Sequence, residues 1–483
     1  MFIEQYPIDK LRPADYNPRA ITEKSLEDLY SSIAEIGMAK PVIVTPDGLI
    51  IAGHQRTKTL KKLGVDYCPA YIIEEKVNLT DEISFNQLHN ASDIETRGGL
   101  VTVPKSTNLG WEEVEADTIE VDMSQVETGA IERNEMMKLI TQYGEWGASI
   151  ATQSGEVLIS RDYAICCKIL GVPLRLFRVP DDKVDRVRYW FNKDYGYFSY
   201  QNLEKTTYVQ TMAQPIRLRA NKNNLTSYTY ELFIIPWMKA NPEARVLDFG
   251  AGQMDYVQHL KKQGFNIKGY EPFFRKKGKL AIDLETIHEH VAAVCEDLKT
   301  YGLYDAIVCD AVINSVDSLQ AEVDVLTCLS ALVKKGGKIF YAGRSLYQQK
   351  LTVERAKKRG NVNDANTVFL DHNNFTATYT RGYWLYQKFH SLEQIHEMTQ
   401  KYVADNYAVY NTNQNVVDDE KKISKYFYVV TEGKKDLPLG QIIPSLRREF
   451  DMMQPQGKSI GKADEIEDAY IEALAIEKRE GRL

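Results

Sequence analysis

Apolar and polar positions in the second half of the chain alternate between short apolar runs and longer helix-like segments. Residues 246–249 form one apolar run, residues 304–310 form a second that ends in an acid, and residues 338–341 form a third. Residues 320–333 have helical periodicity. Short apolar strands that alternate with helices are typical of a sheet covered by helices. The pattern therefore predicts an α/β domain, which we place at residues 241–435.

The first hundred residues have a different pattern. Residues 25–36 have the periodicity of a helix with one apolar face. Apolar strands at residues 41–44 and 49–52 flank an Asp-Gly pair, which predicts a β-hairpin, and a second helix follows. We therefore expect a small α+β domain at residues 1–95.

Landmarks of this first domain recur 107 residues later in the same order. They are Gly37, Gly48 and Leu63-Gly64-Val65 in the first copy, and Gly144, Gly155 and Leu170-Gly171-Val172 in the second. Such a repeat indicates a duplicated domain, which we place at residues 119–205. The Gly-His-Gln-Arg sequence at residues 53–56 becomes Ser160-Arg161-Asp162-Tyr163 in the copy, and Asp162 would oppose a phosphate. We interpret the copy as a packing partner or a wall that shapes the substrate site.

The remaining segments connect or extend these domains. Glycine and proline breakers make residues 96–118 a linker, and residues 206–240 lead into the α/β domain. An insertion at about residues 345–382 carries a basic run. The tail, residues 436–483, includes a charged amphipathic helix suited to docking or dimerisation.

Composition bounds the kind of protein. A chain of 483 residues suggests about three domains at ~150 residues each. No apolar run approaches the ~20 residues of a membrane span, and the first residues do not form a signal peptide. Six cysteines are scattered without metal-ligand spacing, so we expect reduced thiols, a cytoplasmic location and no metal site. A net charge of −7 argues against a generally basic nucleic-acid coat, though not against a local basic groove.

The apolar run at residues 246–249 leads into a glycine turn that suits a nucleoside-bearing cofactor. A dinucleotide fingerprint requires a third glycine, but Asp255 occupies that position. Asp248 would also repel a pyrophosphate. S-adenosylmethionine has no phosphate, and its cationic end tolerates nearby acids, so the residues favour it over a dinucleotide.

The Asp-x-Gly-x-Gly pattern, with an acid after the next strand, resembles motifs I and II of class I methyltransferases. That resemblance implies a Rossmann-like, seven-stranded sheet and S-adenosylmethionine as the cofactor. The cofactor-binding residues that it implies are Asp248, Gly250, Gly252, Glu271 and Asp297.

Residues 310–316 should line the pocket of the methyl acceptor. They lack the Asp/Asn-Pro-Pro-Tyr motif of amino-directed DNA methyltransferases, and the chain lacks the Pro-Cys motif of cytosine-C5 enzymes. The segment resembles methyltransferases associated with DNA phosphorothioation systems. Asp310 and Asn314 are our candidate catalytic residues for orienting the acceptor; the alternative is a strand-end acid and a helix cap.

The order of elements in the first domain, with the Gly53-His54-Gln55-Arg56 turn at a helix start, resembles the ParB/sulfiredoxin superfamily. The resemblance implies two small α+β domains ahead of the methyltransferase and a turn that grips nucleotide phosphates. The helix N-terminus and Arg56 both suit a phosphate, and a nucleoside triphosphate with Mg²⁺ is the expected ligand. Asn86 and Asn90 match the family's second polar segment more loosely, because its usual acid and arginine are absent. The alternative is a capped helix with a solvated arginine.

These features together predict a methyltransferase that modifies DNA in a phage or mobile-element setting. The first ParB-like domain would bind a nucleotide or DNA phosphate and recruit or gate the catalytic domain. Two alternatives stay open: the residue 53–56 site is itself a nucleotide-dependent transferase or nuclease, or the chain is a nucleotide-gated DNA clamp with a regulatory S-adenosylmethionine domain. DNA is the expected partner, no membrane is expected, and the ParB-like domains or the C-terminal helix could form an oligomer.

Overall fold

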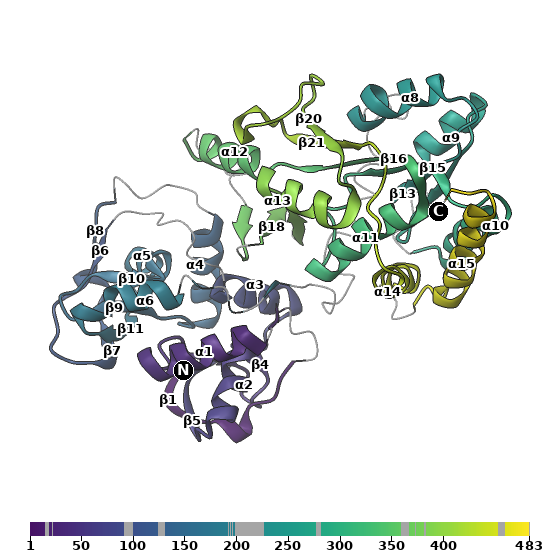
Figure 1. The fold of residues 1–483 in the computed structure, drawn as a ribbon. Helices are drawn as coiled ribbons and strands as arrows, with labels where there is room; N and C mark the ends of the chain where they lie inside the picture. The colour runs from purple at the N-terminus through teal and green to yellow at the C-terminus, as the bar shows by residue number, and fades with distance from the viewer. Residues whose placement is uncertain are drawn as a thin grey trace. The chain divides into compact units, whose positions relative to one another are not determined.

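The structure is a computed structural model of residues 1–483. It describes residues 1–482 apart from residues 15–18, 22, 91–99, 124–130, 192, 194, 196, 199–226, 277–281, 359–366, 372, 381–382 and 453–458. The chain divides into two compact units (Figure 1). Unit 1 contains residues 1–203 and 352–383, and unit 2 contains residues 204–351 and 384–483. Most of the predicted insertion is therefore grouped with unit 1, whereas the sequence placed it inside the α/β domain.

The first half of unit 1 is a small α+β fold. Its four-stranded sheet has the order β1-β5-β3-β4, in which β3 and β5 are parallel and the other neighbours antiparallel. Its elements are β1 (Phe2–Pro7), η1 (Ile8–Lys10), β2 (Arg19–Ala20), α1 (Glu23–Ile36), β3 (Val42–Val44), β4 (Ile50–Ala52), α2 (His54–Leu63), β5 (Tyr67–Ile72) and α3 (Leu79–Asn90).

The second half of unit 1 repeats this fold. Its sheet has the order β7-β11-β9-β10, with β9 and β11 parallel, which matches the first sheet strand for strand. Its elements are β6 (Val101–Thr102), β7 (Gly110–Val114), η2 (Ala116–Thr118), β8 (Glu120–Val121), α4 (Ile131–Tyr143), β9 (Ser149–Thr152), β10 (Val157–Ile159), α5 (Arg161–Leu170), β11 (Leu174–Val179), η3 (Asp181–Lys183), α6 (Val184–Phe191) and β12 (Tyr197–Phe198).

One pair of equivalent helices shows how closely the backbone of the second copy repeats that of the first. Helices α2 and α5 begin and end 107 residues apart. Gly64 and Gly171, both left-handed with φ of +67° and +66°, end them with equivalent backbone hydrogen bonds. This likeness supports the predicted duplication. The second copy begins before residue 119, because its strand β7 lies within the expected linker. The side chains of β7 are mostly half-buried and show no clear apolar alternation, so the sequence pattern did not indicate this strand.

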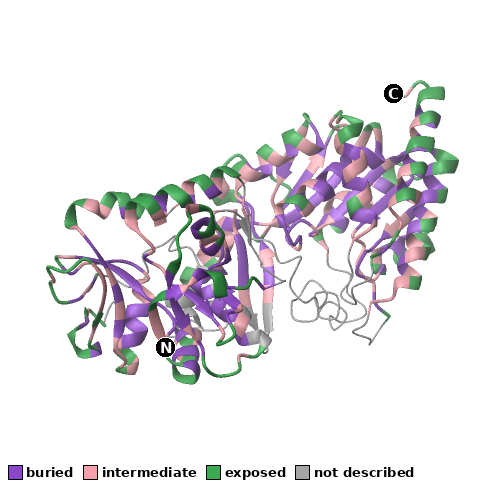
Figure 2. Ribbon diagram, turned by 90° about the horizontal axis from the view of Figure 1, so that it is seen from below, coloured by how far each residue is buried: buried purple, intermediate pink, exposed green. Residues whose placement is uncertain are grey.

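The two copies share one core. Buried residues from both copies belong to a single hydrophobic cluster. Figure 2 colours the buried residues of the chain purple. Phe85 of the first copy packs edge-on against Trp146 of the second, with ring centroids 5.4 Å apart. Asp81 accepts hydrogen bonds from Lys138 Nζ and from the Tyr143 hydroxyl, each 2.7 Å long. The contacts support the interpretation of the second copy as a packing partner.

Unit 2 is built on a six-stranded sheet with the order β14-β13-β15-β16-β21-β20. Strands β14, β13, β15 and β16 are parallel, and β21 is antiparallel to both of its neighbours. The strands are β13 (Val246–Phe249), β14 (Ile267–Tyr270), β15 (Tyr304–Asp310), β16 (Val333–Arg344), β20 (Tyr407–Tyr410) and β21 (Tyr426–Thr431). The class I methyltransferase fold is therefore confirmed, with six described strands instead of the seven expected.

Helices and short elements surround this sheet. They are η4 (Thr229–Ile234), α8 (Ile235–Ala240), α9 (Asp255–Lys262), α10 (Leu284–Tyr301), α11 (Leu319–Leu332), α12 (Leu346–Lys358), α13 (Leu392–Met398), η5 (Thr399–Val403), η6 (Glu420–Lys422), α14 (Leu439–Phe450) and α15 (Ala463–Arg479). The inserted strands are β17 (Thr367–Phe369), β18 (Phe375–Thr380) and β19 (Tyr383–Lys388), of which β17 and β18 pair antiparallel. None of the described helices has the length and apolar character needed to cross a bilayer.

The C-terminal helices belong to the α/β unit. Helix α15 packs on α10, and α14 packs on α11 and α15. Phe450 stacks on Tyr270 with ring centroids 4.4 Å apart, and Glu477 accepts a hydrogen bond from the backbone N–H of Leu303. The apolar face of α15, with Ile466, Tyr470 and Ile476, is buried, so this helix docks within its own unit. Its expected part in dimerisation stays a prediction.

Candidate functional site

The order of strands in the unit 2 sheet reverses direction at β13. From β13 the chain passes to β14 on one side and later to β15 on the other. Ligands of open α/β sheets bind outside the carboxyl ends of the strands where the order reverses in this way. Asp248 lies within β13 just before its end, Glu271 follows β14, and Asp310 ends β15. The fold therefore brings three sequence-predicted acids to the same edge.

The glycine turn after β13 forms a cradle at this edge. Gly250 has φ of +87° and donates its N–H to the carbonyl of Tyr270. A Cβ on Gly250 would lie 2.3 Å from Cγ2 of Val312, so no larger residue fits. Gly252 has φ of +59°, and a Cβ there would meet no atom within 4 Å. The turn thus leaves open space that a ligand can approach closely.

The acids around the cradle are positioned by hydrogen bonds. Glu271 is buried and accepts hydrogen bonds from the N–H groups of Gly252 (2.7 Å) and Phe273 (3.0 Å). Asp248 is buried and accepts a hydrogen bond from the hydroxyl of Tyr230. An open turn flanked by carboxylates fits S-adenosylmethionine, whose ribose hydroxyls donate hydrogen bonds and whose sulfonium is cationic.

Asp310 is held by the segment that precedes the domain. Its two carboxylate oxygens accept hydrogen bonds from the hydroxyls of Ser227 (2.6 Å) and Thr229 (2.7 Å). Tyr230 stacks on Tyr256 with ring centroids 4.0 Å apart. The sequence indicated only that this segment leads into the α/β domain, and its polar contacts were missed. The Ser-Tyr-Thr-Tyr sequence at residues 227–230 was the available signal.

Asn314 lies on the loop that follows β15. Its side chain is buried, its Nδ2 donates to Ser315 Oγ (3.3 Å), and its backbone carbonyl accepts the N–H of Lys388. The side-chain oxygen Oδ1 is buried and accepts no hydrogen bond from any residue that the structure describes. A buried amide oxygen without a donor is costly, so this atom marks a place where a ligand N–H or O–H fits.

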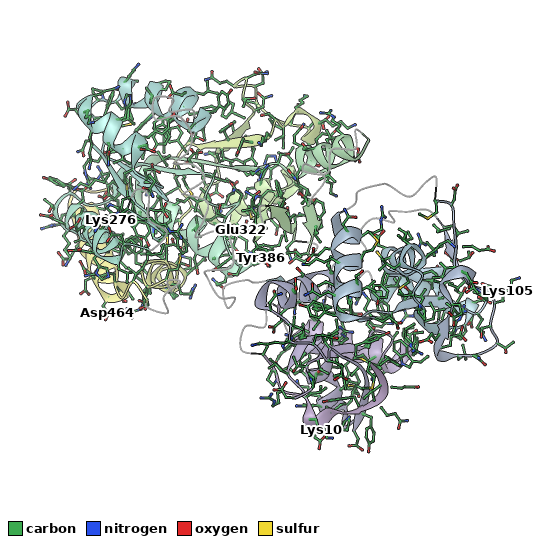
Figure 3. The ribbon with its side chains drawn as sticks, turned by 180° about the vertical axis from the view of Figure 1, so that it is seen from behind. Lys10, Lys105, Lys276, Glu322, Tyr386 and Asp464 are labelled. Carbon is green, nitrogen blue, oxygen red and sulfur yellow. The ribbon has the colours of Figure 1, made fainter. Side chains whose placement is uncertain are left out.

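A buried charged cluster stands beside this loop. Glu322, labelled in Figure 3, forms an ion pair with Lys388 and a 2.5 Å hydrogen bond with Nε2 of His390. Burial raises the pKa of Glu322, but the charge of Lys388 and the hydrogen bonds with Lys388 and His390 outweigh it and hold the pKa below its usual value. Burial lowers the pKa of His390. The neutral ring donates Nε2–H to Glu322, and Nδ1 has no partner within the described residues. No sequence motif indicated this cluster, because Glu322 lies 66 residues from Lys388 and 68 residues from His390 along the chain.

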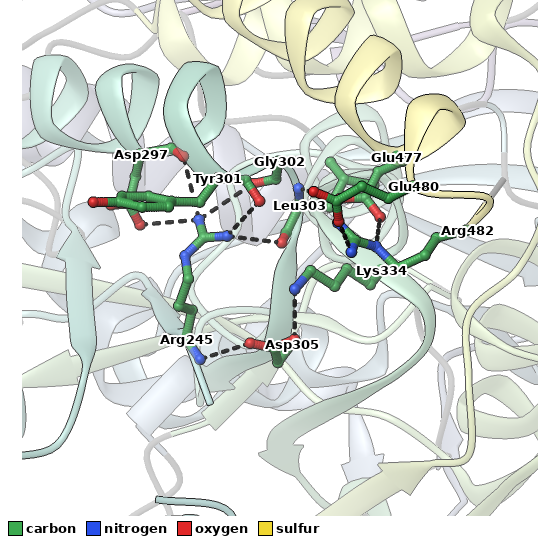
Figure 4. Close-up of polar contacts among 10 residues, drawn as sticks. All are labelled: Arg245, Asp297, Tyr301, Gly302, Leu303, Asp305, Lys334, Glu477, Glu480 and Arg482. Carbon is green, nitrogen blue, oxygen red and sulfur yellow. Dashed lines mark hydrogen bonds and ion pairs between the residues drawn. The ribbon is translucent and has the colours of Figure 1, made fainter. Parts of the chain in front are cut away.

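Asp297 does not lie at the cofactor edge, so its prediction as a cofactor-binding residue is wrong. It sits on α10 and binds Arg245 Nη2 at 3.1 Å and Lys268 Nζ at 3.0 Å. Arg245 precedes β13 and also donates to the carbonyls of Tyr301 and Leu303, as Figure 4 shows. The ion pair therefore closes the amino edge of the sheet.

The Gly53 turn in unit 1 starts helix α2 as predicted. Gly53 has φ of +104°, and a Cβ there would lie 2.7 Å from Cγ1 of Val42. His54 is buried, and its Nε2 accepts the backbone N–H of Ala14 at 3.1 Å. Burial, with a smaller contribution from Arg56, lowers the pKa of His54 to about 4. His54 is thus a neutral residue that anchors the N-terminal segment.

The other predicted phosphate ligands also bind within their own domain. Arg56 Nη1 donates to the carbonyl of Lys40 (2.5 Å), and Nη2 lies 3.0 Å from Nδ1 of His89. Asn86 is buried and donates to the carbonyl of Ile51. Gln55 is half-buried at the start of α2, and the side chain of Asn90 lies outside the described residues. The turn has the predicted position, but Arg56 and Asn86 also have structural contacts.

Comparisons with known proteins give the same two parts. Residues 2–86 match the ParB N-terminal domain family, and residues 218–387 match a methyltransferase domain family. The ParB-like nuclease domain-containing protein YnaK of Escherichia coli is 33% identical over 76 residues, covering 16% of this chain and 84% of that protein. A probable chromosome-partitioning protein ParB of Coxiella burnetii is 30% identical over 119 residues, covering 23% of this chain and only 41% of that protein. A solved methyltransferase from Thermotoga maritima is 15% identical, covers 44% of this chain and 90% of its own, and has a TM-score of 0.24.

Proposed function

Since the chain belongs to the ParB N-terminal domain family and is also a SAM-dependent methyltransferase, we propose that it methylates DNA and that its ParB-like module recruits or gates the catalytic domain. The observation that carries the methyltransferase half is the carboxyl edge of the unit 2 sheet. There the Gly250 and Gly252 turn, Glu271 and Asp310 meet where the strand order reverses. The DNA half rests on the ParB-like module, because a relative of that module is a probable chromosome-partitioning protein.

The cofactor site assigns a separate task to each residue. Glu271 would accept hydrogen bonds from the ribose hydroxyls, and Asp248 would favour the cationic end electrostatically. Bound S-adenosylmethionine supplies an electrophilic methyl group. The remaining task of the protein is to align the acceptor with that methyl group, since positioning alone lowers the barrier to transfer substantially.

The acceptor that fits the site best is an exocyclic amine of a base. Asn314 Oδ1 is a buried acceptor without a donor, and an amine N–H would satisfy it. Asp310 is the last residue of β15, four residues before Asn314, and Ser227 and Thr229 fix its orientation. Asn314 would therefore orient the amine lone pair toward the cofactor, and Asp310 would define the wall of the pocket.

The ParB-like module would bind a phosphate of DNA or of a nucleoside triphosphate with Mg²⁺ at the Gly53 turn. The N-terminus of the ten-residue helix α2 provides N–H groups and a favourable dipole. The Escherichia coli relative is a ParB-like nuclease domain-containing protein, which favours a catalytic module as the second candidate. The internal contacts of Arg56 and His54 speak against a catalytic role for these two side chains, so the proposed phosphate binding rests on the N-terminus of α2.

Location, setting and assembly belong to the same proposal. The six cysteines are all buried free thiols, which suits a reducing cytoplasm. We place the activity in a phage or mobile element, and any oligomer would form through the ParB-like domains.

Incubation with radiolabelled S-adenosylmethionine tests the proposed substrate. We expect label in duplex DNA, less or none in RNA and free nucleotides, and loss of labelling in Asn314→Leu with cofactor binding retained. Labelling of RNA or nucleotides but not DNA would contradict the proposed acceptor. DNA nicking that depends on Arg56 would support the nuclease candidate.

A further inference from the structure

Arg275 is a buried arginine beside the proposed cofactor site. It lies four residues after Glu271, and its backbone is fixed by an antiparallel bridge to Ile282. The neighbouring carbonyl of Phe274 accepts the N–H of Asp283. Only 2% of the Arg275 surface is exposed. The guanidinium is therefore enclosed by unit 2 and held at a fixed position.

The guanidinium lacks the partners that a buried arginine normally has. Its Nε and Nη1 are buried and donate to no atom of the described residues. The charge acting on it is the carboxylate of Glu271. Burial lowers the pKa of Arg275 to about 10, and Glu271 only partly opposes this effect. Buried donors without acceptors are costly and rare in folded proteins, so a ligand is the natural source of the missing acceptors.

Arg245 in the same domain shows what a structural arginine looks like. It is also buried, and its Nε likewise has no acceptor among the described residues, but both of its terminal nitrogens are paired. Nη2 binds the carboxylate of Asp297, and Nη1 donates to the carbonyls of Tyr301 and Leu303. Arg275 has no equivalent set of contacts, although the fold encloses it more completely.

The position of Arg275 in the sheet indicates which half of the cofactor it faces. Strand β14 is the edge strand, and β13 lies between it and β15. The reactive methyl group must point toward the proposed acceptor residues, Asp310 at the end of β15 and Asn314 on the loop after it. The opposite, nucleoside end must then point toward β14, where Glu271 and Arg275 follow the strand.

We propose that Arg275 donates its Nε–H and Nη1–H to hydrogen-bond acceptors on the nucleoside half of the cofactor, and so determines cofactor specificity together with Glu271. The proposal rests on the proposed S-adenosylmethionine site. The acceptors available on the nucleoside half are the ring nitrogens of the base and the ribose oxygens. We exclude the carboxylate of the amino-acid half as the partner of Arg275, because it lies at the other end of the ligand.

Calorimetric titration of the full chain separates these possibilities. The ligands are S-adenosylmethionine and 5′-methylthioadenosine, which keeps the nucleoside and the sulfur but lacks the amino acid. The variants are Arg275→Met, which keeps the length and apolar stem, and Arg447→Met as a control at a surface ion pair with Glu467. We expect Arg275→Met to lose at least tenfold in affinity for both ligands by the same factor, and Arg447→Met to lose none.

Thermal unfolding without ligand is the second measurement. We expect Arg275→Met to melt at or above the wild-type Tm, because the substitution removes buried donors that have no acceptor. Unchanged affinity for both ligands would overturn the proposal, and so would a loss for S-adenosylmethionine alone, which would assign Arg275 to the carboxylate. An affinity loss that comes only with a large fall in Tm would also overturn it. A wild-type chain that binds neither ligand would instead refute the proposed cofactor.

Discussion

The two copies in unit 1 solve the same structural problem with opposite chemistry. Arg56 and Tyr163 occupy equivalent positions, 107 residues apart. Arg56 donates to the carbonyls of Lys40 and Pro41. Tyr163 instead accepts the backbone N–H groups of Trp146 and Gly147, each at 3.0 Å. Both side chains therefore fix the segment before the central strand, which shows that this position serves the fold in each copy.

A second pair of equivalent positions also differs between the two copies. Gly53 faces Val42 in the first copy, whereas the equivalent residues of the second copy are Ser160 and Ser149. Ser149 Oγ donates to the carbonyl of Ser160 at 2.9 Å, and Ser160 adopts the left-handed conformation with φ of 59°. The second copy thus holds the same turn without a glycine, and the side chain opposite it, Ser149, is smaller than Val42. A Gly-His-x-Arg turn is consequently weak proof of ligand binding by itself.

Removing the Tyr163 side chain should have the largest effect on this comparison. Tyr163→Ala leaves a cavity in the shared core and two buried N–H groups without an acceptor, so we expect a loss of about 3–5 kcal/mol. Tyr163→Phe removes only the hydroxyl and should cost about 1–3 kcal/mol. Hydrogen exchange at residues 146–152, followed by mass spectrometry, measures the change in opening free energy. Equal protection in wild type and Tyr163→Ala would contradict the proposed role of the hydroxyl and ring.

Acid should destabilise the first copy through His54, whereas the second copy has Arg161 at this position. The folded protein holds the pKa of His54 at about 4, below its ordinary value of about 6.5. Above pH 6.5 the residue is neutral in both states and its contribution is complete. As the pH falls from 6.5 to 4, only the unfolded chain takes up a proton, and stability falls by about 1.4 kcal/mol per pH unit, or ~3 kcal/mol in total.

Pulse proteolysis in urea between pH 7.5 and 4.5, with quantified peptides from residues 1–90, measures this loss. In His54→Gln the part of the pH dependence that comes from this residue should disappear. An unchanged pH dependence in that variant would assign the acid sensitivity to other groups.

Exchanging the turn residues should have smaller effects of opposite sign. Gly53→Ala forces a left-handed alanine against Val42 and should cost about 2 kcal/mol or more. Ser160→Gly relieves a left-handed serine and should stabilise by at most about 1 kcal/mol, offset by the greater freedom of the unfolded chain. Urea denaturation of the two variants measures both values. Destabilisation of similar size in both would show that the copies do not differ at this turn.

The sequence predicted those parts of the molecule that depend on local order along the chain. The glycine turn at residues 250–252, the strand-end acid Asp310 and the helix starting after Gly53 all follow from spacing, and the fusion of a ParB-like domain with a methyltransferase is confirmed. The role of Asp297 was wrong because its ion pair with Arg245 joins residues 52 positions apart. The burial of the apolar face of α15 likewise depends on α10, a helix far away in the sequence.

Contacts between residues far apart in the sequence also explain which site residues the sequence did not reveal. Tyr230 reaches Asp248 from a segment outside the predicted domain, and Glu322 meets His390 only in the folded unit. The sequence could not show that Nε and Nη1 of Arg275 lack hydrogen-bond acceptors among the described residues, because the residue type does not indicate which groups surround it in the folded chain.

Binding of S-adenosylmethionine to the full chain, measured by calorimetry for wild type and Glu271→Ala, tests the central claim most directly. Glu271 is buried at the end of β14 and hydrogen-bonded to the glycine turn, so its loss should remove the contacts to the ribose. We predict saturable binding to wild type and an affinity at least tenfold lower for Glu271→Ala, with the ligand-free variant still folded. No binding to wild type, or equal binding to both proteins, would contradict a cofactor site at this edge of the sheet.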